Sequence, residues 1–387
     1  MKKLAIIITH PIQYYVPLFQ LLAKNCELKI FYTWGADGAK AKYDPDFKQL
    51  INWDLPLLEG YEYEFLLNTA KDPGSHHFNG IINPTLKEQI TDFNPKAILI
   101  YGWAYHSHLQ TIRYFKGKIP LWFRGDSTIL NLKKGLKQIM RSIYLSWVYK
   151  HIDIAFYVGI ANKAYFKKFG LTDNQLIFAP HAVDNNRFAE DREIEALAFR
   201  RQLQLTDDQI LILFAGKLEA NKNPEILLKA FLELNLVGVH LLFVGNGELE
   251  EKLKAKKILQ QSQYTNTNNV HFINFQNQTS MPVVYQACNV FCLPSQSETW
   301  GLAVNEAMAC AKAILVSDKV GCAEDLVKNG KNGYIFESNN IESLKSKLRL
   351  LLGSNEDIIE MGKSSATIIN SWTIAAQGKS ILKELAK

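Results

Sequence analysis

Two glutamates separated by seven residues, Glu298 and Glu306, have the spacing in this 387-residue chain that most clearly suggests chemistry. An apolar run, residues 290–294, precedes them and helix-forming residues 303–312 follow, so the pattern predicts strand, loop and helix. A helix starting near Gly301 would present free backbone N–H groups and the positive end of its dipole to an anion. Carboxylates on both sides of an anion site suit a ligand with hydroxyls on both sides of a phosphate, as in a nucleotide sugar.

These glutamates also have a plainer interpretation, in which one caps the helix and the other is an ordinary helix residue. A second cluster argues against it: an apolar stretch, residues 210–215, ends at Gly216, and Lys217 and Lys222 follow. Glycine permits a tight turn, and charge-assisted contacts from lysines to a diphosphate contribute about 1.5–3 kcal/mol each. Because α/β sheets bind ligands at the carboxyl ends of their strands, the two clusters together predict a phosphate site.

Gly245 follows a further apolar stretch, residues 241–244, as part of a Gly-Asn-Gly step. It either lets the backbone approach a nucleotide or merely turns the chain, and the sequence favours neither. The first apolar stretch of the chain ends at Thr9 and His10 without a Gly-x-Gly-x-x-Gly motif. A dinucleotide fingerprint is therefore absent there.

Polar residues also follow apolar stretches in the N-terminal half. Arg124 and Asp126 come directly after residues 120–123. Asp126 could orient or deprotonate an acceptor hydroxyl, or it could equally cap the following helix. Three further residues, His10, Gln13 and His181, are candidates for the edge of a binding cleft, although a lone histidine is more often structural than catalytic.

These motifs resemble those of the retaining GT-B glycosyltransferases of family four, the glycosyl transferases group 1. Glu298 to Glu306 is similar to the E-x7-E signature of that family, and Gly216-Lys217-Leu218 with Lys222 is similar to its Gly-Arg-Leu…Lys diphosphate motif. The resemblance covers nearly the whole chain. It extends to Pro180-His-Ala-Val-Asp184, Val320-Gly-Cys-Ala-Glu324 and Asn332-Gly-Tyr334, and to three segments similar to a bacterial subgroup: His10-Pro-Ile-Gln-Tyr14, Trp53-Asp-Leu-Pro-Leu-Leu-Glu-Gly-Tyr61 and Arg124-Gly-Asp-Ser127.

The resemblance implies a role for each residue. Lys217 and Lys222 would stabilise the leaving nucleoside diphosphate, Glu298 would hold hexose hydroxyls, and Glu306 would hold the ribose. Other donor contacts would come from the residues around the glycine turns: Gly216, Gly245, Thr299, Trp300, Gly301 and Leu302. The chain departs from the family twice. Lys217 replaces the usual arginine, and the Arg124–Asp126 step lacks the histidine of many relatives, which leaves Asp126 as the catalytic candidate there.

No metal or other cofactor is expected. The family transfers its sugar with retention of configuration and without an essential metal, because fixed positive charge stabilises the leaving group. Asp44-Pro-Asp46 matches the Asp-x-Asp string of metal-dependent enzymes. That string lies in a polar stretch interrupted by proline, with no apolar strand leading into it, so it predicts a turn.

The alternation of strand-like and helix-like segments predicts an α/β fold of the GT-B type, with two Rossmann-like doubly wound domains facing each other across a cleft. The predicted strands are residues 4–9, 28–32, 97–101, 120–123, 154–157 and 175–179, then 210–215, 241–244, 270–273, 291–293 and 314–316. We expect an N-terminal acceptor-side domain over residues 1–185 and a donor-binding domain over residues 186–370. By resemblance, a C-terminal helix over residues 371–387 crosses back to the first domain.

Composition is that of a soluble globular protein, with 47% hydrophobic and 21% charged residues. A net charge of +6 suits anionic small ligands or a membrane surface and is too small for a nucleic-acid footprint. No apolar run reaches the ~20 residues that a membrane span needs, and the apolar start of the chain turns polar at His10, which favours a strand over a signal peptide. The chain has five cysteines, an odd number, and none of them forms a Cys-x-x-Cys motif. This pattern favours buried free thiols over disulfides, as in a cytoplasmic protein.

A predicted helix over residues 134–149 separates a basic face, with Lys133, Lys134, Lys137 and Arg141, from an apolar one. It could lie on an anionic membrane near a lipid-linked acceptor, at the inner face of the cell membrane. It could equally be a surface helix that packs on the sheet.

Together these observations predict a metal-independent, retaining glycosyltransferase of the hexosyltransferase type. Its donor would be a UDP- or GDP-sugar and its acceptor a saccharide or lipid-linked saccharide, in bacterial surface polysaccharide synthesis. Two alternatives fit the same architecture: a nucleotide-sugar 2-epimerase and a non-catalytic nucleotide-sugar-binding protein. The intact pair of Glu298 and Glu306, with both lysines, argues against a loss of catalysis.

Overall fold

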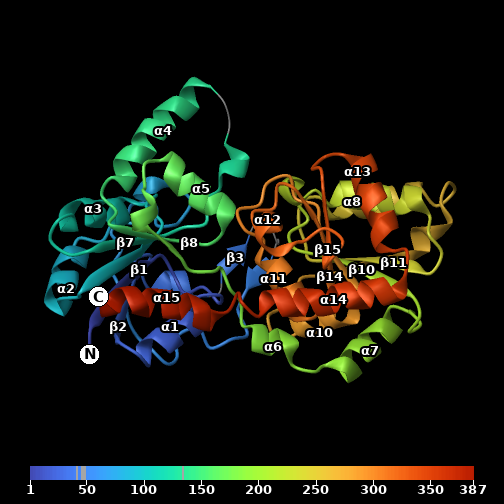
Figure 1. The fold of residues 1–387 in the computed structure, drawn as a ribbon, viewed down its shortest axis with the longest axis horizontal. Helices are drawn as coiled ribbons and strands as arrows, with labels where there is room; N and C mark the ends of the chain where they lie inside the picture. The colour runs from blue at the N-terminus through green and yellow to red at the C-terminus, as the bar shows by residue number, and fades with distance from the viewer. Residues whose placement is uncertain (41, 45–48, 133–134) are drawn as a thin grey trace. The chain divides into compact units, whose positions relative to one another are not determined.

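The computed structural model describes residues 1–40, 42–44, 49–132 and 135–387. The chain forms two compact units (Figure 1). Unit 1 comprises Met1–Ala41, Leu55–His181 and Thr373–Lys387, and unit 2 comprises Lys42–Asp54 and Ala182–Trp372. The chain therefore passes into unit 2 twice before its last segment returns to unit 1.

Unit 1 is built on a seven-stranded parallel sheet with the order β5-β2-β1-β6-β7-β8-β9. Its strands are β1 (Lys3–Ile8), β2 (Glu27–Tyr32), β5 (Glu62–Phe65), β6 (Ala97–Tyr101), β7 (Leu121–Arg124), β8 (Ile154–Tyr157) and β9 (Leu176–Phe178). Its helices are α1 (Val16–Ala23), α2 (Leu86–Phe93), α3 (His106–Phe115), α4 (Leu136–Tyr149), α5 (Ile160–Lys168) and α15 (Ile374–Ala386). β1 lies in the interior of the sheet, because β2 and β5 lie on one side of it and β6 to β9 on the other.

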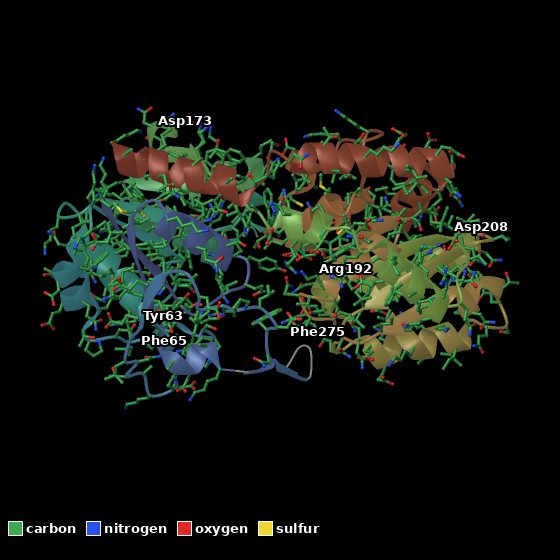
Figure 2. All side chains as sticks on the ribbon, turned by 90° about the horizontal axis from the view of Figure 1, so that it is seen from below. Tyr63, Phe65, Asp173, Arg192, Asp208 and Phe275 are labelled. Carbon is green, nitrogen blue, oxygen red and sulfur yellow. The ribbon has the colours of Figure 1, made fainter. Side chains whose placement is uncertain are left out.

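Both faces of this sheet are buried, which explains why its strands are almost continuously apolar. In β1, Ala5 and Ile7 point into one hydrophobic cluster while Leu4 and Ile6 point into the other. On the edge strand β5, Tyr63 and Phe65 (Figure 2) pack edge to face with ring centroids 5.2 Å apart. The alternation of glutamate and aromatic residues in β5 therefore reflects a half-buried edge strand, which our predictions missed.

The C-terminal helix α15 belongs to unit 1 and packs beside α1 (Figure 1). Its Ile381 and Leu385 are buried in the cluster that also contains Leu18 of α1. A Cβ atom at Gly378 would lie 2.5 Å from Leu21 Cδ2. Glycine at this position lets the two helices approach closely.

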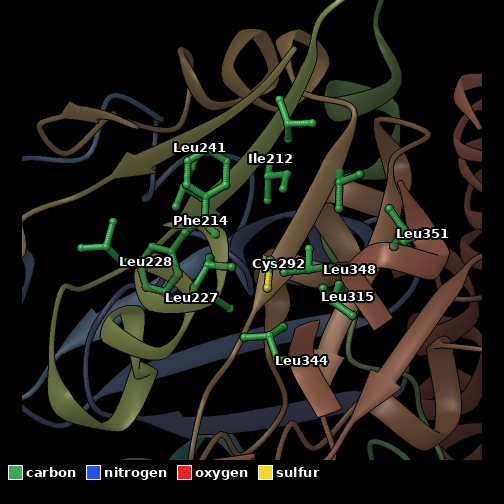
Figure 3. Close-up of a cluster of buried hydrophobic side chains, with 14 of the residues drawn as sticks. Ile212, Phe214, Leu227, Leu228, Leu241, Cys292, Leu315, Leu344, Leu348 and Leu351 are labelled. Carbon is green, nitrogen blue, oxygen red and sulfur yellow. The ribbon is translucent and has the colours of Figure 1, made fainter. Parts of the chain in front are cut away.

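Unit 2 contains a six-stranded parallel sheet with the order β12-β11-β10-β13-β14-β15. Its strands are β10 (Ile210–Ala215), β11 (Val239–Val244), β12 (Val270–Ile273), β13 (Val290–Leu293), β14 (Ala313–Ser317) and β15 (Gly333–Phe336). Its helices are α6 (Asn185–Ala189), α7 (Glu193–Gln202), α8 (Pro224–Leu234), α9 (Glu250–Leu259), α10 (Met281–Ala287), α11 (Leu302–Ala309), α12 (Ala323–Leu326), α13 (Ile341–Leu351) and α14 (Asn355–Ile369). Figure 3 shows Ile212, Phe214 and Leu241 of the strands packed in one cluster with Leu344, Leu348 and Leu351 of α13.

The predicted α/β fold with two Rossmann-like domains is confirmed. The predicted strands all form, with ends that differ by at most two residues from those observed. The missed strand β15 starts at Gly333, where a Cβ atom would lie 1.8 Å from the Ile314 carbonyl oxygen of β14. The strands predicted from the sequence end with residues 314–316 and therefore do not include β15.

A short antiparallel hairpin, β3 (Lys42–Asp44) and β4 (Gln49–Ile51), is part of unit 2 although its sequence lies in the N-terminal half. The Asn277 side chain donates to the Asn52 carbonyl oxygen at 2.7 Å, and the Thr279 N–H donates to the Asp54 carboxylate at 3.1 Å. Asp44 ends β3, while Asp46 lies outside the described residues, so the predicted turn stays a prediction. None of the helices in the described ranges has the length and apolar content to cross a bilayer.

Candidate functional site

The strand order of unit 2 reverses between β10 and β13, and all the residues predicted to bind the donor except Gly245 follow these two strands. In doubly wound sheets, ligands bind in the crevice outside the carboxyl ends of strands at such a switch point. The Gln296 N–H donates to the Asn221 carbonyl oxygen at 2.8 Å, which ties the loop after β13 to the loop after β10.

Across these two loops the ammonium of Lys222 forms an ion pair with the carboxylate of Glu298. Their side chains are only 23% and 15% exposed, so the pair is largely withdrawn from water. Lys217, which follows β10 after Gly216, is half-buried. The structure thus brings Lys222 and Glu298 together, and it adds a direct contact that spacing in the sequence could not predict.

The backbone that leads into α11 is held by the loop after β14. The Glu298 N–H donates to the Lys319 carbonyl oxygen at 3.1 Å, and the Cys322 N–H donates to the Trp300 carbonyl oxygen at 2.9 Å. A Cβ atom at Gly321 would lie 1.8 Å from the Thr299 carbonyl oxygen. The two loops are therefore in contact along their backbones before any ligand binds.

The helix α11 starts at Leu302, after Gly301 in a left-handed conformation with φ of 97°. No side chain of the described residues caps this end, and its first turn carries no acidic residue. The N-terminus of α11 therefore keeps its positive potential for a ligand. Trp300 lies in the core: its indole N–H donates to Asn305 at 2.9 Å and its ring packs 5.2 Å from that of Trp372.

Glu306 lies on α11 with only 3% of its surface exposed. One of its carboxylate oxygens accepts a hydrogen bond from the Tyr285 hydroxyl of α10 at 2.7 Å. Tyr285 was not among the predicted site residues, because a tyrosine inside an apolar helix has no distinguishing signal. It holds the Glu306 carboxylate in one orientation.

Gly216 and Gly245 let the loops after β10 and β11 touch. Gly245 has a φ of 131°, and a Cβ atom there would lie 2.1 Å from the Gly216 carbonyl oxygen. The Leu218 N–H also donates to the Asn246 carbonyl oxygen at 2.9 Å. The structure shows a third role for Gly245, a close approach of one backbone to another, and a contact with a nucleotide stays a prediction.

Unit 1 has a cavity of about 260 Å³ at the carboxyl ends of its central strands. Its polar lining includes Tyr15, Tyr101, Tyr105, Arg124, Asp126 and His181. The strand order of this sheet reverses between β1 and β6, so this cavity is also at a switch point. Three of the residues predicted as site residues in the N-terminal half line this cavity: Arg124, Asp126 and His181.

Arg124 is buried, and its guanidinium donates to the carbonyl oxygens of Ala179 at 2.9 Å and Pro180 at 3.1 Å. In the amide orientation that satisfies its neighbours, Gln377 of α15 accepts a hydrogen bond from Arg124 at 3.1 Å and donates one to Pro180 at 3.3 Å. These bonds make Arg124 a positioning residue in unit 1.

His181 is buried and stacks on the Tyr15 ring with centroids 6.0 Å apart. Burial, helped by the charge of Arg124, lowers the pKa of His181 to about 3, so its ring is neutral at pH 7. His10 lies at the edge of the Trp34 ring and its Nδ1 is 2.8 Å from the Thr9 hydroxyl. His10 and the half-buried Gln13 are not among the residues that line this cavity.

The Tyr101 hydroxyl is buried and has no hydrogen-bond partner among the described residues. Burial raises the pKa of Tyr101 to about 12, which keeps the phenol protonated. Asp126 lies close enough for its negative charge to add to the effect of burial in raising the pKa of Tyr15. Since buried polar groups are almost always paired, the free Tyr101 hydroxyl in this cavity suits a ligand with hydroxyls of its own.

Within the described ranges, one group of side chains could hold a metal ion: Asp72, His76 and His77. The Asp72 carboxylate is 3.0 Å from His76 Nε2, and both side chains are exposed. The group lies in unit 1. The five cysteines are free and buried, as predicted.

Comparisons with known proteins relate part of this chain to glycosyltransferases. The family model "Glycosyl transferases group 1" matches residues 196–366, a segment that lies inside unit 2. An uncharacterized glycosyltransferase of Haemophilus influenzae is 33% identical over 167 residues, covering 42% of this chain and 45% of that protein. An N-acetylgalactosaminyltransferase of Campylobacter jejuni, named as acting on a diphospho-undecaprenol substrate, is 25% identical over 236 residues, covering 59% of this chain and 58% of that protein.

The chain spans about half the length of the curated relatives that it matches. Among solved structures, HepE of Anabaena in complex with UDP has a TM-score of 0.75 at 18% identity, over the full length of both chains. Sucrose-phosphate synthase of Thermosynechococcus elongatus has a TM-score of 0.73 at 18% identity, covering 100% of this chain and 99% of the other. These likenesses confirm the GT-B fold, and the segment over residues 196–366 is related to group 1 glycosyltransferases. The subgroup suggested by the His10 motif stays a prediction.

Replacing Gly245 by alanine should destabilise unit 2 more than the same change at Gly238. Both glycines have positive φ, but a Cβ at Gly238 meets open space whereas one at Gly245 meets the Gly216 carbonyl. Backbone strain alone costs about 1–2 kcal/mol, and the added clash should raise the loss to roughly 2–4 kcal/mol for Gly245→Ala. Denaturant unfolding of both variants measures this, and equal losses would contradict a close contact between the loops.

Proposed function

We propose that the protein is a retaining glycosyltransferase that moves a sugar from a UDP- or GDP-sugar to a saccharide or lipid-linked saccharide, in bacterial surface polysaccharide synthesis. The observation that carries this proposal is the arrangement at the unit 2 switch point. There, Lys222 and Glu298 meet beside the uncapped N-terminus of α11. A cation, a carboxylate and a helix N-terminus together match a diphosphate that is joined to a sugar.

On the donor side, the reaction leaves a nucleoside diphosphate whose negative charge grows as the sugar departs. Lys217, Lys222 and the N-terminus of α11 would stabilise that charge in the transition state. In the free protein Lys222 is paired with Glu298, so an incoming diphosphate competes for its ammonium. Glu298 would then accept hydrogen bonds from the sugar hydroxyls, and Glu306, held by Tyr285, would accept from the ribose.

The acceptor would bind to unit 1 in the cavity that contains Tyr101 and Asp126. The buried Tyr101 hydroxyl offers an unused hydrogen bond, and the Asp126 carboxylate could orient or deprotonate an acceptor hydroxyl. Two relatives support a saccharide acceptor: the Campylobacter enzyme described above and a Salmonella typhimurium lipopolysaccharide 1,2-N-acetylglucosaminetransferase. The latter is 29% identical over 188 residues, covering 46% of this chain and 49% of that protein.

The decisive experiment is product analysis by mass spectrometry and NMR after incubation with UDP- and GDP-sugars and saccharide acceptors. A new glycoside whose anomeric configuration matches the donor supports the proposal. Epimerised donor without any glycoside would instead identify a 2-epimerase. Tight nucleotide-sugar binding with no product would identify a non-catalytic binding protein.

Lys222→Ala should lower kcat by about 100-fold with little change in KM, because the lost charge acts mainly on the departing diphosphate. Lys229→Ala is the matched control, since Lys229 is an exposed lysine on α8 of the same unit. Steady-state kinetics with varied donor measures both variants. An unchanged kcat with a raised KM would argue that Lys222 only binds the ground state.

Glu306→Gln should weaken the binding of free UDP or GDP about tenfold, since one charge-assisted hydrogen bond to the ribose would be lost. Tyr285→Phe should act in the same direction but less, because it only loosens the orientation of Glu306. Glu298→Gln should leave free nucleotide binding nearly intact and remove the extra affinity for the nucleotide sugar. Calorimetry with both ligands decides, and equal losses for both ligands in all variants would refute these assignments.

Activity should survive chelation by EDTA within about twofold, because fixed lysine and helix charge would replace a metal. High salt should reduce activity, since it screens lysine–phosphate contacts. Loss of activity that Mg²⁺ or Mn²⁺ restores would refute metal independence. The same assay on His76→Ala would then show whether the exposed group around Asp72 supplies the metal.

A further inference from the structure

The helix α4 is buried on one side only. Leu145, Val148 and Tyr149 are its buried residues, and all three belong to its C-terminal part. The first two turns, from Leu136 onward, contribute no buried side chain. Figure 1 shows α4 extending away from the sheet of unit 1. Its N-terminal part thus has little protein to pack against.

The opposite side of α4 is apolar and exposed. Its members are spaced three or four residues apart, as residues on one helical face must be, and they are Leu136, Ile139, Met140, Ile143 and Trp147. Their exposed fractions run from 81% for Leu136 to 39% for Trp147. At 100° per residue this stripe points away from the buried face. A contiguous apolar surface of this kind on a soluble protein usually marks a binding site.

The surroundings of the stripe are positively charged. The sequence has no acidic residue between Asp126 and Asp153, but it has five lysines and arginines there. Of these, Lys137, Arg141 and Lys150 are described and exposed. In a helical projection Lys137 lies about 100° and Arg141 about 140° from Leu136, so both are on the same side of α4, with Lys137 nearer to the apolar stripe.

Aromatic residues stand at the C-terminal end of the stripe. The rings of Tyr144 and Trp147 are 5.7 Å apart, and the Arg113 guanidinium lies 5.8 Å from the Trp147 ring. Tyrosine and tryptophan favour the level of lipid headgroups, where one part of the ring is dry and the other wet. An arginine beside Trp147 adds a phosphate-binding cation at the same level.

We propose that α4 docks unit 1 on an anionic lipid bilayer, with its apolar stripe in the boundary between headgroups and acyl chains. Lys137 and Arg141 would lie at the lipid phosphates. Charge complementarity favours this occupant over a second copy of the chain, because a pair of α4 helices would bring like charges together. A 14-residue helix spans about 21 Å, too little to cross a bilayer core of about 30 Å, so α4 lies in the interface. This inference stands apart from the proposed sugar transfer.

Vesicle co-sedimentation of the full chain tests the proposal. We expect binding to phosphatidylcholine vesicles that contain 30% phosphatidylglycerol, at least tenfold weaker binding to pure phosphatidylcholine vesicles, and loss of binding at high salt. A variant with Ile139→Ser, Met140→Ser and Ile143→Ser should bind at least tenfold more weakly. Lys137→Glu with Arg141→Glu should lose the preference for anionic lipid.

The matched control is Ile258→Ser with Leu259→Ser, which removes two exposed apolar side chains from α9 of unit 2. It should bind vesicles like the unaltered protein. Thermal unfolding shows that each variant is folded, since the exchanged side chains are exposed. Absence of binding to anionic vesicles at low salt overturns the proposal, as does equal binding by the serine variant. Light scattering that shows a dimer, lost in the serine variant, without vesicle binding would identify a second copy as the occupant.

Discussion

The contact between Lys222 and Glu298 is the interaction on which the architecture of unit 2's switch point depends. It joins the loops after β10 and β13 through opposite charges that are mostly withdrawn from water. Two charges in such surroundings stabilise each other but cost free energy when one partner is removed. In the proposed function, the same contact links binding of the diphosphate to binding of the sugar. A diphosphate that pairs with the Lys222 ammonium releases the Glu298 carboxylate, which can then accept hydrogen bonds from the sugar.

Much of the fold followed from the sequence because both sheets are covered on two sides. Strands such as β10 and β13 are then apolar throughout and stand out from the polar loops that follow them. Polar residues that come directly after such strands must gather at the carboxyl edge of the sheet. This reasoning put Gly216 and Lys222 beside Glu298 and Gly301, since their two strands are neighbours.

Features that depend on side-chain partners or on long-range packing could not be predicted in this way. The Tyr285 hydroxyl reaches Glu306 from a helix with no polar pattern, and the hairpin of β3 and β4 belongs to unit 2 despite its place in the sequence. Likewise, the sequence showed that residues around α4 separate into apolar and basic faces. Only the structure shows that the buried side of α4 is small and that the larger apolar stripe is exposed.

The way in which α15 completes unit 1 has a consequence for synthesis of the chain. Ile381 and Leu385 fill a hydrophobic cluster with residues of β1 and α1, and Gln377 meets the carbonyl oxygen of Pro180 that Arg124 also holds. These residues are synthesised only after Ala182–Trp372, and domains generally fold as units in the order of their synthesis. The earlier segments of unit 1 must therefore wait for α15, and their hydrophobic cluster stays open to solvent or to chaperones while Ala182–Trp372 is made.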